Sequence, residues 1–249
     1  MTDQIHMSPT RAFKFSKNPL RAYQDYIGQI DWWEGSKDAV LFGTLVHNVA
    51  EGMDLLTGLS DEEKDLLISK TGKTKGQLKK QYQDAEIIGK HLRDYASQFG
   101  QAEYEVPFDE ESETGNGIQF TATGRADMLT ENAVFDFKTV APMDFNHFRE
   151  NDYQYFRDNR QEEYKKQIAW YAFIFEKEEA HLLYVAKNPD KPFIYDYKMD
   201  SDEIKRYADE MGDEIEQAVN YINDPDNIPA VNDGSKWAFG YFGGVITND

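Results

Sequence analysis

Alternating apolar and polar residues predict a pair of strands near the middle of the chain. Residues 118–140 hold two such runs separated by a short polar turn, which is the layout of a β-hairpin. Counting by twos along the second run places Asp136 and Lys138 on one face and Phe135 and Phe137 on the other. One face of this strand is therefore apolar, and the opposite face carries charges.

Apolar residues recur at helical spacing elsewhere along the chain. The predicted helices cover residues 37–57, 75–99, 160–176 and 200–222, and two further helices begin at Ser8 and at Ser60. Further strands are expected at 102–108, 181–188 and 191–199, with an acidic loop at 109–117 and an aromatic tail with glycine turns at 237–244. Ser8 before Pro9 is a typical helix start, Pro19 ends or restarts that helix, and Ser60 with Glu63 forms a capping box. This order predicts an α/β fold with a mixed central β-sheet flanked by helices.

The composition favours one large domain. The 249 residues are 40% hydrophobic and 14% aromatic, enough for a sizeable core. We expect a single domain over 1–249, with a mainly helical part at 1–100, the sheet at 101–199, and a helix with the tail at 200–249. The chain has no cysteine, which excludes disulfides, thiolate zinc sites and cysteine-bound iron–sulfur clusters. No membrane span or signal sequence is evident, so we expect a cytoplasmic protein.

The net charge of −19 argues against general affinity for phosphates. The charges are segregated, however, because the acids pool at 103–113 and 200–226 while two basic runs occupy 11–21 and 70–80. Either basic run can steer a polyanion toward one region or simply form a solvated helix face. The adjacent Trp32 and Trp33 either belong to the hydrophobic core or stack on nucleic-acid bases.

The charged face of the hairpin holds the candidate chemistry. Asp127 and Asp136, joined by a tight hairpin, can point toward one cation, and Mg²⁺ or Mn²⁺ prefers such oxygen ligands. Lys138 emerges on the same face as Asp136, about 6–7 Å along the strand. There its ammonium can stabilise charge on an attacking hydroxide or on a phosphate. The pattern by itself is weak, since acidic and basic residues alternate on many exposed strands.

Two residues of the predicted 37–57 helix extend this picture. His47 and Glu51 are four residues apart and therefore share one helix face. A histidine in such a helix is either a hydrogen-bonded core residue or a ligand, and spacing does not separate these alternatives. Glu51 is explained equally well by an ordinary ion pair with its neighbour.

Four ordered pieces of the chain resemble the PD-(D/E)XK nuclease superfamily, in the branch of RecB-type nuclease domains and phage or prophage exonuclease VIII (RecE-type) proteins. The pieces are SPTRAFKFSKNP at 8–19, GTLVHNVAE at 43–51, GRAD with DFK within 124–138, and QIAWY at 167–171. The resemblance implies a restriction-endonuclease-like core. Relatives that carry an iron–sulfur cluster have a cysteine before the proline that corresponds to Pro19, and Asn18 stands there in this chain.

The resemblance also implies roles for the matching residues. His47, Asp127 and Asp136 would be metal ligands, with the backbone carbonyl of Phe137 completing the set. Lys138 would be the catalytic lysine. The glutamine–tyrosine motif beside the site corresponds to Gln167 and Tyr171. Glu51 would either support the metal ligands without binding the metal or be a ligand for another cation. Candidate DNA-contacting residues are Arg11, Lys14, Lys17 and Arg125.

The implied function is that of a Mg²⁺-dependent or Mn²⁺-dependent exonuclease, with two ions, acting on linear double-stranded DNA. By resemblance it would digest one strand 5′ to 3′ and leave a 3′ single strand for an annealing protein in phage recombination. It would form a ring-shaped trimer or tetramer in a bacterial or phage-infected cell. One alternative is an endonuclease or a repair or CRISPR-associated nuclease with the same site. The other is a non-enzymatic acidic protein that mimics DNA or binds a protein partner.

Overall fold

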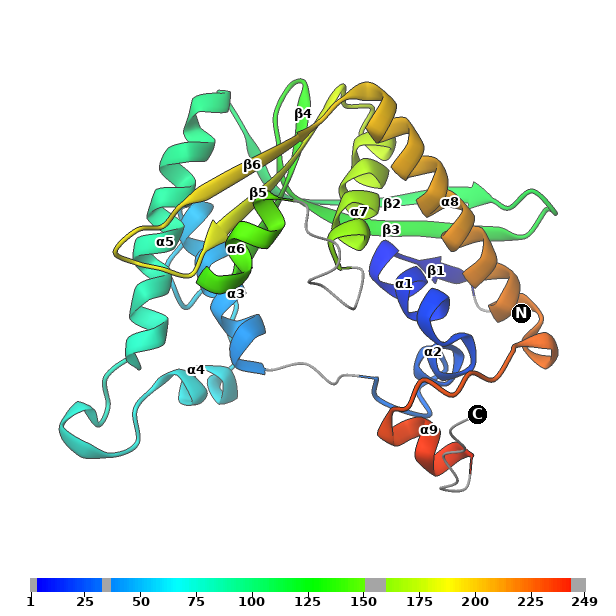
Figure 1. Ribbon diagram of the computed structural model, residues 1–249, viewed down its shortest axis with the longest axis horizontal. Helices are drawn as coiled ribbons and strands as arrows, with labels where there is room; N and C mark the ends of the chain where they lie inside the picture. The colour runs from blue at the N-terminus through cyan, green and yellow to red at the C-terminus, as the bar shows by residue number, and fades with distance from the viewer. Residues whose placement is uncertain (1–3, 33–36, 151–159, 243–249) are drawn as a thin grey trace. The chain divides into compact units, whose positions relative to one another are not determined.

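The computed structural model describes residues 4–32, 37–150 and 160–242 (Figure 1). The chain divides into two compact units that interleave in sequence. The first unit comprises Met1–Glu34, Pro107–Arg125 and Lys205–Asp249, and the second comprises Gly35–Val106 and Ala126–Ile204. Within the described ranges, no helix has both the length and the apolar character that crossing a membrane would require.

The strands form a six-stranded mixed sheet. Its members are β1 (Ile5–Met7), β2 (Glu103–Glu113), β3 (Gln119–Leu129), β4 (Ala133–Val140), β5 (Glu179–Ala186) and β6 (Ile194–Met199). The hydrogen-bonded order is β1-β3-β4-β5-β6, and β2 also pairs with β3. Pairs β1–β3 and β4–β5 are parallel, while β3–β4 and β5–β6 are antiparallel. The prediction of a mixed α/β sheet with two hairpins is confirmed.

Helices pack on both faces of β4 and β5 in the second unit. The helices of this unit are α3 (Lys37–Ala50), α4 (Asp61–Leu67), α5 (Lys80–Ala96), α6 (Pro142–Arg149) and α7 (Arg160–Ile174). Phe135 and Phe137 of β4 join one apolar cluster with residues of α3 and α5, which lie side by side in Figure 1. The opposite face of β4, with Asp136 and Lys138, lies toward α7. The predicted division of β4 into an apolar and a charged face is confirmed.

Close packing of α3 against α5 depends on one glycine. A Cβ atom at Gly89 would lie 2.6 Å from the Val49 Cβ and 2.8 Å from the Val46 carbonyl oxygen, which is too close for any side chain. The absence of a side chain at Gly89 therefore lets the two helices approach closely at this point.

Several predicted helix boundaries shift in the structure. The helix expected at 37–57 ends at Ala50, because Gly52 has a φ of +84° that a helix does not accommodate. The helix expected at 75–99 is α5 from Lys80, followed by a 3₁₀ turn at Ser97–Phe99 and by Gly100 at a φ of +91°. The capping box of Ser60 and Glu63 is confirmed at the start of α4.

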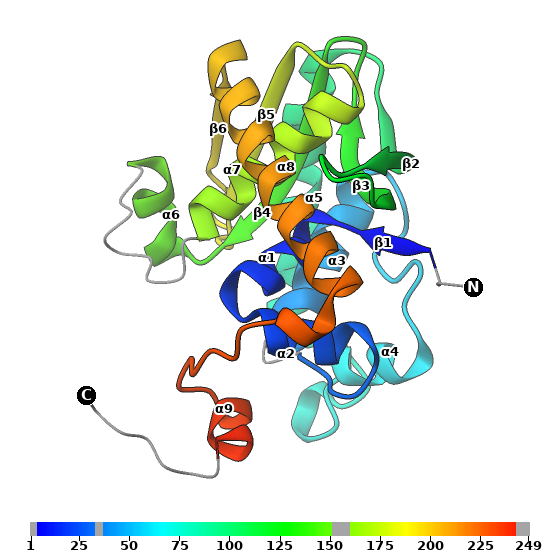
Figure 2. The ribbon, with the colours of Figure 1, turned by 90° about the vertical axis from the view of Figure 1, so that its right-hand side faces the viewer.

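The first unit contains α1 (Pro9–Lys17), α2 (Pro19–Tyr26), most of α8 (Ser201–Asn223) and α9 (Lys236–Tyr241). Ser8 caps α1, as predicted, and the helix restarts at Pro19 as α2, for which the structure adds Asn18 as the cap. Helix α8 runs alongside α1 (Figure 2), where Ser16 donates a hydrogen bond of 2.9 Å to Glu214 and Phe15 stacks on Tyr221. These contacts connect the two ends of the chain.

Two predictions in this part of the chain were wrong. The acidic stretch expected to form a loop continues β2 as far as Glu113, because it pairs with β3 instead of turning away. The tail expected to form glycine turns begins with α9, which Ser235 caps and in which Trp237 stacks on Tyr241 at 5.0 Å. Trp33 lies outside the described residues, whereas the Trp32 ring packs under the Arg21 guanidinium at 4.3 Å.

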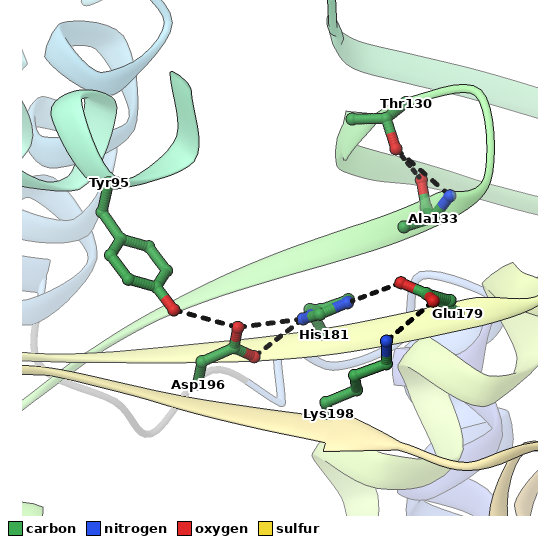
Figure 3. Close-up of polar contacts among 7 residues, drawn as sticks. All are labelled: Tyr95, Thr130, Ala133, Glu179, His181, Asp196 and Lys198. Atoms are coloured by element: carbon green, nitrogen blue, oxygen red, sulfur yellow. Dashed lines mark hydrogen bonds and ion pairs between the residues drawn. The ribbon is translucent and has the colours of Figure 1, made fainter. Parts of the chain in front are cut away.

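A buried polar network ties α5 to β5 and β6 (Figure 3). His181 Nδ1 lies 2.8 Å from Asp196 Oδ1, and Tyr95 donates a hydrogen bond of 3.1 Å to Asp196 Oδ2. Burial and then the Asp196 carboxylate raise the pKa of Tyr95 to about 12, so that its hydroxyl remains a donor. The His181 ring also stacks on Phe135 at 4.7 Å, directly beside the strand position of Asp136.

Replacing Asp196 with alanine should destabilise the protein. Asp196→Ala leaves a buried imidazole and a hydroxyl without their acceptor, which costs about 1–3 kcal/mol in the free energy of unfolding. Lys198→Ala is the matched control on the same strand, because its ion pair with Glu179 is half exposed and contributes below about 1 kcal/mol. Urea denaturation measures both, and equal losses would contradict the importance of the buried network.

Candidate active site

The β3–β4 hairpin brings Asp127 and Asp136 to neighbouring positions. Met128 pairs with Phe135, so continuing the antiparallel register by one residue sets Asp127 opposite Asp136. At the next residue of β4, the Phe137 backbone N–H donates a hydrogen bond of 2.6 Å to Asp127 Oδ2, a side-chain atom of β3. The hairpin therefore holds both carboxylates on one face of the sheet, as predicted.

Asp136 and Lys138 form a buried ion pair on that face. Lys138 Nζ lies 2.9 Å from Asp136 Oδ1 and 2.7 Å from Oδ2, and Asp136 is only 2% exposed. Burial lowers the pKa of Lys138, but the carboxylates of Asp136 and Asp127 raise it by more, so the net pKa lies above its ordinary value. Lys138 is therefore an ammonium throughout the neutral pH range.

His47 reaches the same site from α3. Its Nε2 lies 3.1 Å from the Phe137 carbonyl oxygen, and its Nδ1 lies 3.7 Å from Asp127 Oδ1. The side chain is 22% exposed rather than enclosed in the apolar core. The structure thus brings together His47, Asp127 and the Phe137 carbonyl, three groups that the family resemblance assigns to one metal site.

Glu105 of β2 is a further acidic residue of the site that the sequence did not indicate. One ligand atom each from His47, Glu105 and Asp127 lies within 4.8 Å of the others. The Glu105 backbone has a φ of +51°, a left-handed conformation that is uncommon for a residue other than glycine and is often associated with functional sites. Strand alternation makes Glu103 and Glu105 equivalent, so no pattern in the sequence singles out Glu105.

The carboxylate of Asp127 is poorly accommodated without a cation. Its side chain is 14% exposed, and burial is the largest effect that raises its pKa to about 6. The nearby Asp136 carboxylate raises that pKa as well, whereas His47 and Lys138 lower it. A bound divalent cation would offset both burial and repulsion.

Gln167 and Tyr171 lie one turn apart on α7 and form the predicted pair. Gln167 Nε2 donates a hydrogen bond of 3.0 Å to the Tyr171 hydroxyl oxygen. Burial raises the pKa of Tyr171, and the charges of Asp136, Lys138 and Asp127 also act on it. The pair therefore lies close to the charged face of the hairpin.

Glu51 does not belong to the group of three ligands found among the described residues. Burial raises the pKa of Tyr104, the Glu51 carboxylate raises it further, and Arg93 lowers it, which places Glu51 near Tyr104 and Arg93. Among the described residues, the group that meets metal-ligand spacing contains Glu105 and not Glu51. Asp136, whose carboxylate binds Lys138, is also outside that group. The ligand roles of Glu51 and Asp136 remain predictions.

The candidate DNA-contacting residues Arg11, Lys14, Lys17 and Arg125 all belong to the first unit. Lys14 forms an ion pair of 2.7 Å with Asp25, and Arg11 bonds to the His6 carbonyl and lies over the Tyr26 ring. Two residues of the basic run, Arg11 and Lys14, thus already have partners within the first unit. Arg125 is exposed. A role of these four residues in binding DNA remains a prediction.

The donor set of the site fits a hard divalent cation. Carboxylate and carbonyl oxygens with one imidazole suit Mg²⁺ or Mn²⁺, and no thiolate is available to select zinc. The raised pKa of Asp127 points the same way, since a cation would stabilise its ionised form. Next to these groups, the Lys138 ammonium supplies a fixed positive charge for an anionic substrate.

Comparison with known proteins agrees with this geometry. A family model described as a PDDEXK-like domain of unknown function matches residues 12–226. No curated protein matches the sequence.

Two solved structures are similar to the chain at 17% sequence identity. The first, a candidate exonuclease from Eubacterium rectale, has a TM-score of 0.70 and covers 98% of this chain and 90% of its own. This likeness shows a shared fold. The second, a protein designated SSO0001, covers 85% of this chain and 76% of its own, and its TM-score of 0.38 is too low to support an argument.

The metal-free protein should lose stability as pH rises through the titration of Asp127. The pKa of Asp127 in the folded protein is about 6, above the ordinary 3.8. The protonated carboxyl therefore contributes its full share to the free energy of unfolding below pH about 4, and this share is lost as the pH rises to about 6. Asp127→Asn should remove up to about 3 kcal/mol of that loss. Thermal unfolding at pH 4 and pH 8 measures the difference, and Mg²⁺ should raise the midpoint of the wild type more than that of the variant. Equal pH dependence in the two proteins would contradict the assignment.

Glu105→Gln should raise the Mg²⁺ concentration that half-stabilises the protein by roughly tenfold, because one charged ligand is lost. Glu103→Gln is the matched control, two residues away on the same strand and exposed. The measurement is the unfolding midpoint as a function of Mg²⁺ concentration. The same requirement in both variants would exclude Glu105 from the metal site.

Proposed function

Because the chain belongs to the family of PDDEXK-like domains, we propose that it is a metal-dependent nuclease that cuts DNA. One observation carries the proposal: Asp127, Asp136 and Lys138 share one face of the β3–β4 hairpin, and His47 adds an imidazole there. Phosphodiester hydrolysis needs an oxygen-rich cation site beside a fixed positive charge, and this face provides both.

Four groups of the chain would hold a divalent cation: His47, Asp127, Glu105 and the Phe137 carbonyl. When bound, such a cation supplies Lewis-acid polarisation of the phosphate and lowers the pKa of a coordinated water. Asp136 is a further candidate ligand, provided that its carboxylate keeps only part of its contact with Lys138. We infer Mg²⁺ or Mn²⁺ from the oxygen-rich donor set. A second ion is proposed from the family resemblance.

Lys138 would stabilise the negative charge that develops on the phosphate. In the metal-free site the carboxylates of Asp136 and Asp127 raise its pKa, which favours the ammonium form as an electrostatic partner and hydrogen-bond donor. Asp136 orients the ammonium before substrate binds, at 2.7–2.9 Å. Gln167 holds the Tyr171 hydroxyl beside the same charges, where the pair can position the sugar–phosphate backbone.

We further propose an exonuclease that digests linear double-stranded DNA from 5′ to 3′. The support is the exonuclease VIII-like motif set and the fold shared with the candidate exonuclease from Eubacterium rectale. A ring-shaped trimer or tetramer that hands a 3′ single strand to an annealing protein belongs to the same proposal. In such a ring, acidic surfaces would face outward, consistent with the net charge of −19.

Purified protein with Mg²⁺ should degrade linear duplex DNA and spare covalently closed circles. Lys138→Ala should reduce the rate by at least about 100-fold, since a preorganised charge at the reacting phosphate is lost. Lys198→Ala, a lysine on β6 that pairs with Glu179, should cut like the wild type. Separate 5′ and 3′ end labels report the direction.

Cleavage of closed circles would favour the endonuclease alternative with the same residues. Absence of cutting by the wild type with Mg²⁺ and with Mn²⁺, or equal cutting by Lys138→Ala, would overturn the nuclease assignment. Light scattering in solution tests the ring, because a monomer would contradict it.

A further inference from the structure

Lys138 has a second neighbour besides Asp136, the aromatic ring of Tyr164. Lys138 Nζ lies 4.8 Å from the ring centroid, within the range of a cation–π interaction. Tyr164 is three residues before Gln167 and seven before Tyr171 on α7, so all three share one helix face. The predicted glutamine–tyrosine helix thus presents a third residue to the charged face of β4.

The surroundings of the ammonium favour this contact. The Lys138 side chain is 20% exposed, so little water competes for its charge, and cation–π attraction strengthens when the cation is desolvated. A lysine has a long flexible stem, and its head samples many positions unless several partners restrict it. Asp136 restricts it on one side, and Tyr164 restricts it on another.

The Tyr164 ring is itself held by aromatic neighbours from two other elements. It stacks on Phe148 of α6 with centroids 6.2 Å apart and lies 6.4 Å from Tyr184 of β5. Phe148 and Tyr184 are buried and stack on each other at 4.6 Å. The ring therefore offers the ammonium a surface whose position is fixed by the core.

We propose that Tyr164 is a positioning residue that holds the Lys138 ammonium at the reacting phosphate. The proposal rests on the proposed nuclease function. Asp136 is also a candidate ligand for a cation, and any cation that draws its carboxylate away weakens its hold on Lys138. The Tyr164 ring binds no such cation, so it keeps Lys138 in place whichever partner Asp136 has.

Chemical labelling tests the contact without any cleavage assay. Metal-free protein is treated briefly with an acylating reagent, and mass spectrometry measures the rate of modification at Lys138. Tyr164→Leu should raise that rate by roughly tenfold, because both the ring and its attraction for the charge are lost. Tyr164→Phe keeps the ring face and should label like the wild type.

Kinetics on linear duplex DNA at saturating Mg²⁺ test the consequence for the reaction. Tyr164→Leu should lower kcat by roughly tenfold with little change in KM, and Tyr164→Phe should restore it. Tyr195→Leu is the matched control, since Tyr195 is also half-buried and stacks on Tyr184 at 6.1 Å, and it should leave both constants unchanged.

If Tyr164→Leu folds poorly, phenylalanines of increasing fluorine content at position 164 weaken the negative ring face at nearly constant size. The kcat should then fall stepwise with fluorination. A flat series, or equal effects of Tyr164→Leu and Tyr195→Leu on labelling and kcat, would overturn the role of Tyr164. A clear labelling difference in a protein that cuts no DNA would instead refute the nuclease function and leave the contact standing.

Discussion

The close approach of two carboxylates and one ammonium on the β3–β4 hairpin is the interaction on which the site depends. Asp136 is almost fully buried, and it is tolerated there because Lys138 lies within 2.9 Å of its carboxylate. Within the described ranges the nearest ion-pair partner of Asp127 is His47 at 3.7 Å, and burial beside another acid raises the pKa of Asp127. The hairpin is therefore a strained electrostatic arrangement that a cation would relieve.

The two faces of β4 explain how the fold supports this arrangement. Phe135 and Phe137 pack into the apolar cluster with α3 and α5, which fixes the strand from one side. The same packing carries His47 of α3 to the Phe137 carbonyl. From the other side, α7 contributes Gln167, Tyr171 and Tyr164, so helices on both sides of the strand supply polar groups to the site.

Polar groups in the second unit serve two different purposes. The network of His181, Asp196 and Tyr95 is buried and internally paired, which is typical of a group that stabilises a particular packing of strands and helix. The site around Asp127 instead gathers acids, one of them Glu105 with a left-handed backbone, without enough positive charge nearby. That contrast separates a structural network from a candidate catalytic one within the same sheet.

The sequence by itself determined the features that depend on local patterns. Strand alternation identified the charged face of β4, Ser8 and Pro19 located the starts of the first two helices, and the ordered motifs identified the superfamily. Only the tertiary structure decided which distant residues meet. Glu105 and Tyr164 come from separate elements, and nothing in their immediate sequence distinguishes them from Glu103 or other tyrosines. The role of Glu105 follows from its left-handed backbone and its position near His47 and Asp127. The role of Tyr164 follows from the packing of α7 against β4. Both depend on contacts between residues far apart in the chain.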